Sequence, residues 1–288
     1  MKTWFITGAN GGLAYSMLEI LLERGDRVAA TVRKPQALDE LQKKYGSSLW
    51  RANLDLTDSH AIQQIVNQAI EDLGAIDILV NNAGYGLFGA VEEVSDEQIE
   101  HVFQTNFFGS LRVARAFMPY FRRQGKGHIV QISSMVGHLS NPGQGLYSAS
   151  KWAVEGAFET LAKEAAPFHI KLTLVEPGGI RTGFFANHGV FGPELDAYDD
   201  QPARDFKKLY QNIHTKEVVD RDVIPGDSQK MAKAIIQRVD EGNGPLRLAL
   251  GSDAYEEIKA ALTSRLAELE AQKELAYSTD ADDVVHNR

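Results

Sequence analysis

The stretch "FITGANGGLA", residues 5–14, is the first strong indication of the fold. An apolar run ends at Thr7, a glycine-rich turn follows, and apolar residues then recur at helical spacing. Such a strand–turn–helix junction presents backbone N–H groups and the positive end of a helix to an anion. Gly8 permits the tight turn, and Gly12 lets the backbone approach a pyrophosphate. A glycine-rich turn can also serve backbone geometry alone, so this motif needs support from the rest of the chain.

The composition indicates a soluble globular protein with a large core, since 43% of the 288 residues are hydrophobic. The net charge of −9 and the lack of long Lys/Arg runs argue against nucleic acid and membrane as partners. Cysteine is absent and the eight histidines lack metal-ligand spacing, so we expect neither disulfides nor a metal site. No apolar run is long enough for a signal peptide or a membrane span, which predicts a cytoplasmic protein.

Short apolar runs alternate with amphipathic stretches along most of the chain. The predicted strands are TWFIT (3–7), RVAATV (27–32), LWRANLDL (49–56), IDILVN (76–81), GHIVQIS (127–133), IKLTLVE (170–176) and LRLAL (246–250). Apolar strands separated by helices indicate a parallel sheet covered on both faces. We predict one doubly wound α/β domain of Rossmann type over residues 1–276, with a seven-stranded, mainly parallel sheet. The pattern weakens in an irregular excursion at 183–225, a charged helix follows near 252–273, and an acidic flexible tail covers 277–288.

Tyr147 and Lys151 stand four residues apart in "YSASK", residues 147–151. On a helix, positions i and i+4 lie on the same face. A nearby cation favours the phenolate, so Lys151 would lower the pKa of Tyr147 and suit it to proton transfer with a carbonyl or an alcohol. A bare Y-x-x-x-K is more often a half-exposed helix start with a surface lysine, so this pair also needs support.

Three further motifs end predicted strands: "NNAG" at 81–84, "IVQISS" at 129–134 and "EPGGIRT" at 176–182. Doubly wound sheets bind their ligands at the carboxyl ends of the strands. Together with the glycine loop and "YSASK", these motifs resemble the short-chain dehydrogenase/reductase family, in order and over nearly the whole chain. The pattern is similar to that of bacterial reductases grouped near hydroxysteroid and retinol dehydrogenases.

The resemblance implies roles for the catalytic groups. Tyr147 is the general acid in reduction and the base in oxidation, and Lys151 lowers its pKa and hydrogen-bonds the nicotinamide ribose. Ser134 hydrogen-bonds the substrate oxygen, with Ser133 as the second candidate. Asn106, in "QTNFFG", holds a proton-relay water near Lys151; alternatively, its amide is simply satisfied within a kinked helix.

The resemblance also assigns a nicotinamide dinucleotide site to the loop and the strand ends. With the cations after the second strand, the expected residues are Gly8, Asn10, Gly11, Gly12, Leu13, Arg33, Lys34, Asp55, Leu56, Asn82, Ala83, Gly84, Tyr147, Lys151, Pro177, Gly178, Ile180 and Thr182. Asp55 is expected to meet the adenine amino group. Ala14 replaces the third glycine of the family's loop, and its methyl group is expected to crowd the cofactor and weaken binding.

The residues at the end of the second predicted strand indicate whether the protein binds NAD or NADP. An acid there would hydrogen-bond the ribose 2′-OH and select NAD. Val32 occupies this place, and the cations Arg33 and Lys34 follow it. Two cations can meet a 2′-phosphate, so we predict NADP(H), with NAD(H) less favoured. The alternative is a solvated basic turn without a ligand.

The excursion after Thr182 folds over the substrate in the family that this chain resembles. We expect the substrate to contact Ser134, Met135, Tyr147, Phe184 and Phe185. Aromatic side chains suit a bulky apolar or aryl ketone or secondary alcohol, although the same side chains can merely pack the lid. The predicted function is hydride transfer between NADP(H) and such a small molecule, of carbonyl reductase or alcohol dehydrogenase type.

Two other functions occur on related folds. A non-catalytic cofactor-sensing or binding protein on the same fold has no need of a proton donor, and the complete set of Ser134, Tyr147 and Lys151 argues against it. An epimerase or dehydratase of the extended family would need a longer C-terminal portion. The predicted helices at 96–124 and 147–167 match the family's dimerising surfaces, so a homodimer or homotetramer is expected.

Overall fold

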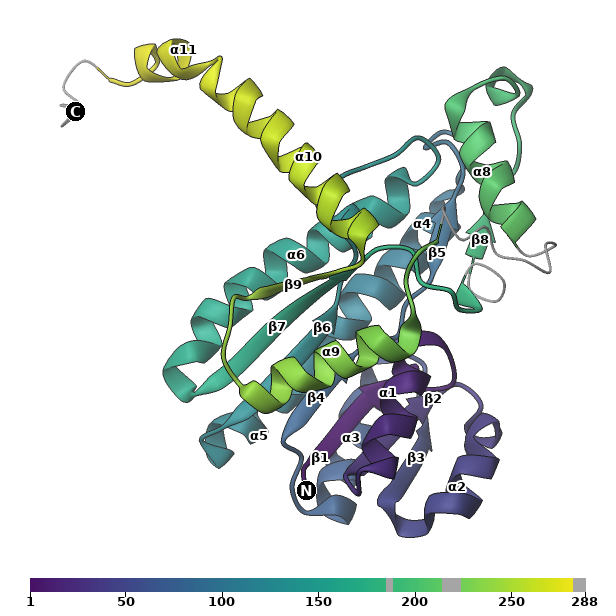
Figure 1. Ribbon diagram of the computed structural model, residues 1–288, viewed down its shortest axis with the longest axis vertical. Coiled ribbons are helices and arrows are strands. Elements are labelled where there is room, and N and C mark those ends of the chain that lie inside the picture. Colours follow the sequence, from purple (N-terminus) through teal and green to yellow (C-terminus); the bar gives the residue numbers. More distant parts are fainter. Residues whose placement is uncertain (185–188, 214–223, 282–288) are drawn as a thin grey trace.

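A seven-stranded sheet forms the centre of the computed structural model, which describes residues 1–184, 189–213 and 224–281 (Figure 1). From one edge to the other, its strands are β3 (Leu49–Asn53), β2 (Arg27–Val32), β1 (Thr3–Thr7), β4 (Ile78–Asn81), β6 (Gly127–Ile132), β7 (Ile170–Pro177) and β9 (Arg247–Leu250). All six neighbouring pairs are parallel. The predicted doubly wound, Rossmann-type sheet is confirmed.

Helices cover both faces of the sheet because its inner strands are apolar on both sides. Residues one apart on a strand point to opposite faces, so Trp4 packs on one face and Phe5 on the other. The Trp4 face is covered by α1 (Gly12–Glu23), α2 (Asp39–Tyr45) and α9 (Ser228–Glu241). The Phe5 face is covered by α3 (Ser59–Leu73), α5 (Ser110–Gln124) and α6 (Gly145–Ala165).

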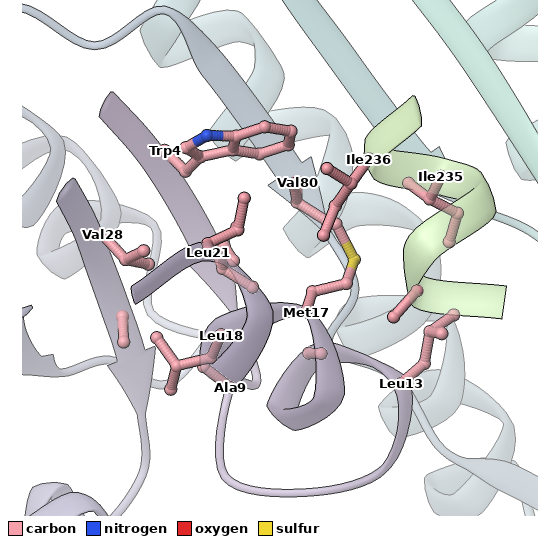
Figure 2. Packing of buried hydrophobic residues seen from close by; sticks show 14 of the residues in the cluster. Trp4, Ala9, Leu13, Met17, Leu18, Leu21, Val28, Val80, Ile235 and Ile236 are labelled. Atoms are coloured by element: carbon pink, nitrogen blue, oxygen red, sulfur yellow. The ribbon is translucent and has the colours of Figure 1, made fainter. Parts of the chain in front are cut away.

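The packing of α9 ties a late part of the sequence to its beginning. Figure 2 shows Ile235 and Ile236 of α9 beside Met17 of α1, with Trp4 and Val80 of the sheet in the same cluster. All five side chains are buried. The first βα unit, which contains the glycine loop, is therefore held in place by residues more than 200 positions later in the chain.

The helix predicted over residues 96–124 is interrupted. It consists of α4 (Asp96–Phe103), a π-helical turn (Gln104–Gly109) and α5. At Gly109 the chain comes close to Leu56: a Cβ atom at that glycine would lie 2.7 Å from the Leu56 Cβ. Single π-helical turns are frequent at functional sites, and this one contains Asn106.

The segment predicted to be irregular, residues 183–225, contains regular structure, and in this respect the prediction was wrong. Strand β8 (Gly189–Phe191) pairs in parallel with β5 (Gly86–Phe88), and α8 (Pro202–Ile213) follows. Arg204 of α8 is buried and forms an ion pair of 3.0 Å with the buried Glu93. A three-residue strand whose partner lies about 100 residues earlier leaves no periodic signal in the sequence.

The C-terminal helices extend away from the body of the protein (Figure 1). They are α10 (Ser252–Glu270), close to the predicted 252–273, and α11 (Lys273–Ser278), which includes the first two residues of the predicted tail. Leu266 and Leu269 of α10 are exposed. Within the described ranges, no helix combines the length and the apolar character that crossing a membrane requires.

The position of α9 gives a test of the fold. Ile235→Ala removes a fully buried side chain and should lower the free energy of unfolding by about 2–5 kcal/mol. The matched change on the projecting helix, Leu266→Ala, should stay within about 0.5 kcal/mol. Urea unfolding of both variants measures the difference, and equal effects would contradict the packing of α9 on α1.

Candidate active site

The carboxyl ends of the central strands open onto one cavity of roughly 370 Å³. This size is in the range of small-molecule and cofactor sites. Of the predicted site residues, the cavity is lined by Gly8, Asn10, Gly11, Gly12, Leu13, Arg33, Asp55, Leu56, Asn82, Ala83, Gly84, Ser134, Met135, Tyr147, Lys151, Pro177, Gly178, Ile180, Thr182 and Phe184. Lys34 and Asn106 lie outside this lining, and Phe185 lies outside the described residues.

The glycine loop leaves the start of α1 open to an anion. Among the described residues no side chain caps this helix, and its first turn contains no acidic residue. Gly8 has a φ angle of +67°, and a Cβ atom there would lie 2.9 Å from Ala83. Asn82 holds the two loops together by donating hydrogen bonds to the carbonyl oxygens of Thr7 and Gly8, at 3.1 and 3.2 Å. The loop therefore fits a pyrophosphate, which would satisfy the N–H groups at the helix start.

Two hydrophobic side chains near this loop are buried in the core. Ala14 is fully buried in the core cluster with Met17, so its methyl group fills space between α1 and the sheet. Val32 is only 2% exposed and packs in the same cluster, although it borders the cavity. Arg33 is the exposed side chain that lines the cavity at the end of β2. A carboxylate at position 32 would therefore be buried.

Asp55 lines the cavity at the same end as Arg33, and its surroundings favour the ionised carboxylate. The backbone N–H and the hydroxyl of Thr57 donate to its Oδ1 at 2.9 and 2.7 Å. The backbone hydrogen bond from Thr57 is the main cause that lowers the pKa of Asp55, and the charge of Arg33 contributes. Asp55 is therefore ionised at neutral pH and can accept a hydrogen bond.

Tyr147 and Lys151 are both buried, at 9% and 5% exposure. Burial raises the pKa of Tyr147 to about 12, and a hydrogen bond with Ser134 opposes this shift. Burial lowers the pKa of Lys151 to about 8, against the opposing charge of Glu155. The Lys151 ammonium donates to the carbonyl oxygen of Ile132 at 3.1 Å and lies 5.9 Å from the centre of the Tyr147 ring.

These values correct the predicted electrostatics of the pair. The sequence predicts that Lys151 lowers the pKa of Tyr147, whereas the pKa of Tyr147 is raised. The physical reason is that burial penalises the phenolate, while the ammonium is hydrogen-bonded to a backbone carbonyl rather than to the phenol. At neutral pH Tyr147 thus carries its proton, the state that a proton donor needs.

Asn106 connects the "NNAG" loop to α6. Its Nδ2 donates to the Tyr85 carbonyl oxygen at 2.9 Å and to the Ser150 hydroxyl at 3.2 Å, and its Oδ1 accepts from the Tyr85 N–H at 3.0 Å. A Cβ atom at Gly84 would lie 3.1 Å from the Asn106 Oδ1 and 3.8 Å from the Lys151 Nζ. The side-chain amide is thus satisfied by protein groups, as the kinked-helix alternative states. The relay water stays a prediction.

Aromatic side chains surround Tyr147. The rings of Phe88 and Phe184 each lie 6.2 Å from its ring, centre to centre, and Phe191 lies 5.5 Å from Phe88. Phe184 was predicted and Phe88 was not. The buried position of Phe88 in β5 follows from the pairing of β5 with β8, which the sequence pattern did not reveal.

Comparisons with known proteins identify the family of this chain. The family model for short chain dehydrogenases matches residues 2–189. "Oxidoreductase BOA17" of Botryotinia fuckeliana is 36% identical over 279 residues, 96% of this chain and 99% of that protein. A 3-ketodihydrosphingosine reductase of Bacteroides thetaiotaomicron is 36% identical over 247 residues, 85% of this chain and 86% of that protein.

The solved structure of a short-chain dehydrogenase from Streptomyces avermitilis superposes with a TM-score of 0.89 at 37% identity, covering 97% of this chain and 100% of that one. More distant structures with the same fold contain NADP or NAD. The matched family model covers more than half of the sequence, and the full-length relatives agree with it. The chain therefore belongs to the short-chain dehydrogenase/reductase family and is an oxidoreductase.

Proposed function

We propose that the protein transfers a hydride between NADP(H) and a ketone or secondary alcohol, with Tyr147 as proton donor and acceptor. The observation that carries the proposal is the buried, protonated phenol of Tyr147, which lines the same cavity as Ser134 and Lys151. A cofactor-sensing protein would need the glycine loop but would gain nothing from a proton donor in an aromatic pocket.

The glycine-loop end of the cavity suits a nicotinamide dinucleotide. The uncapped start of α1 suits the pyrophosphate, and the ionised Asp55 suits the adenine amino group. Arg33 is exposed at the end of β2, where Val32 stands in place of an acid, and this favours NADP(H) over NAD(H). When bound, the cofactor supplies or accepts the hydride at its nicotinamide ring.

The chain's own groups manage the proton. In reduction, the hydroxyl groups of Ser134 and Tyr147 donate hydrogen bonds to the substrate carbonyl oxygen, and Tyr147 transfers its proton to that oxygen. The ammonium of Lys151, 5.9 Å from the centre of the ring, then offsets part of the burial cost of the phenolate that remains. In oxidation, the same groups act in the reverse order. Lys151 also binds the ribose, and a relay water near Asn106 and Lys151 replaces the proton.

The aromatic side chains favour a bulky apolar or aryl substrate. Phe88 is 1% exposed and Phe184 is half-buried, and both rings border the space beside Tyr147. One relative is named 3-ketodihydrosphingosine reductase, the name of an enzyme that reduces a ketone. We therefore infer a small-molecule ketone with an extended apolar portion as the class of substrate.

Tyr147→Phe tests the chemistry. The change removes the proton donor and leaves nearly all of the shape, so turnover should fall by roughly two to four orders of magnitude. NADPH binding, followed by cofactor fluorescence, should persist. The assay is the loss of NADPH absorbance with a panel of aryl and long-chain ketones.

A Tyr147→Phe protein that keeps near-wild-type turnover would rule out this mechanism. If the wild-type protein binds NADPH but oxidises it with none of the ketones, this result would argue against a reductase and favour the cofactor-sensing alternative.

Arg33→Ala tests the choice of cofactor. A charge-assisted hydrogen bond to a phosphate contributes about 1.5–3 kcal/mol, so kcat/KM with NADPH should fall roughly ten- to a hundredfold. Activity with NADH, which lacks the 2′-phosphate, should change far less. Lys34→Ala is the matched control, because Lys34 is exposed but lies outside the cavity lining. Equal losses with both cofactors in Arg33→Ala, or a wild type that prefers NADH, would refute this assignment.

A further inference from the structure

A buried ionic cluster lies one helical turn beyond Lys151. It consists of Glu155 of α6, Glu176 of β7, His138 and Arg247 of β9. Glu155 and Glu176 are 6% and 2% exposed. Arg247 Nε lies 3.1 Å from an oxygen of each carboxylate, and His138 Nε2 lies 2.8 Å from Glu176 Oε1.

The cluster joins the three segments that carry the proposed catalytic and cofactor groups. His138 follows the short 3₁₀ turn Met135–Gly137, which begins directly after Ser134. Glu155 stands on α6 with Tyr147 and Lys151, and Glu176 directly precedes the cofactor segment at Pro177. A displacement of the segment with Glu155 or of the segment with Glu176 would therefore break ion pairs to His138 and to Arg247.

The cluster is not built for a metal ion. The ligand atoms of His138, Glu155 and Glu176 lie within 4.8 Å of one another, a spacing that a cation could use. However, the guanidinium of Arg247 already contacts both carboxylates and supplies the positive charge. A second cation would meet electrostatic repulsion from Arg247.

Glu155 is the member of the cluster that faces Lys151. Tyr147, Lys151, Glu155 and Glu159 follow one another at intervals of four residues, so they form one stripe along α6. Burial raises the pKa of Glu155 and the charge of Glu176 adds to this effect, while Ser133, His138 and Arg247 oppose it.

We propose that Glu155 is a positioning residue for the proposed reaction: anchored by Arg247, it places one negative charge behind Lys151 and, through His138, braces the turn that follows Ser134. This inference rests on the proposed function for its catalytic meaning, but the electrostatic link between Glu155 and Lys151 can be measured without any turnover. The charge of Glu155 opposes the loss of the Lys151 proton, in line with its effect on the pKa of that lysine.

The first experiment follows the titration of Lys151 by NMR of protein labelled with ¹³C at the lysine ε-carbons, with Lys151→Arg used to assign the signal. In Glu155→Gln, the midpoint should fall by about half to one pH unit, because an opposite charge has been removed. Glu159→Gln is the matched control: it removes a carboxylate that also pairs with Arg247, one turn further from Lys151. In Glu159→Gln, the titration midpoint of Lys151 should stay at the wild-type value.

The second experiment measures kcat for ketone reduction against pH. Since the proton of the Tyr147–Lys151 pair is held less tightly in Glu155→Gln, the alkaline loss of activity should begin about half to one pH unit lower. A merely structural role would lower kcat at every pH without shifting the pH at which activity is lost on the alkaline side. Glu155→Asp keeps the charge on a shorter side chain. The pH of the alkaline activity loss should therefore stay near the wild-type value, while kcat falls several-fold.

The outcomes separate the two hypotheses. A shifted lysine midpoint in a protein that reduces no ketone would refute the proposed function and leave the electrostatic link in place. An active protein in which Glu155→Gln moves neither the midpoint nor the alkaline limb would overturn the inference. If Glu155→Gln fails to fold, Glu155→Asp decides: wild-type kcat in that variant would overturn the role of Glu155.

Discussion

The parallel hydrogen-bond ladder is the constraint on which the site depends. Asn81 of β4 pairs with Gln131 of β6, and Ile132 of β6 pairs with Val175 of β7. Backbone N–H and C=O groups in the core need these partners, and a shift of one residue would turn every buried side chain to the opposite face. The register therefore brings the ends of β4, β6 and β7 to one edge, where the three loops after them can line one cavity.

Burial determines the protonation states of the ionisable groups at this edge of the sheet. A phenol and an ammonium held away from water both favour their neutral forms, so Tyr147 retains its proton and Lys151 releases its own more readily. The cost of burying the lysine is reduced by the Ile132 carbonyl and by the carboxylate of Glu155. Strongly perturbed ionisable groups in a cavity are typical of catalytic sites. The ionic cluster behind Lys151 thus belongs to the same electrostatic arrangement as the phenol.

Much of the fold and of the cavity lining was predictable because both follow from local signals. The glycine loop, "NNAG", the serines after β6 and "EPGGIRT" each follow a strand, and one sheet aligns all of these strand ends. Phe88 could not be predicted, since its place depends on the pairing of β5 with a strand about 100 residues later. The burial of Val32, the π-helical turn at Asn106 and the direction of the pKa shift of Tyr147 likewise depend on surroundings that only the folded chain supplies.

A crystal structure of the protein with NADPH would test the proposed cofactor and proton-donor geometry. We expect the pyrophosphate at the start of α1, the 2′-phosphate beside Arg33, and the nicotinamide ribose within hydrogen-bond reach of Lys151, with the ring next to Tyr147. A bound cofactor whose nicotinamide lies away from Tyr147, or whose ribose makes no contact with Lys151, would contradict this geometry.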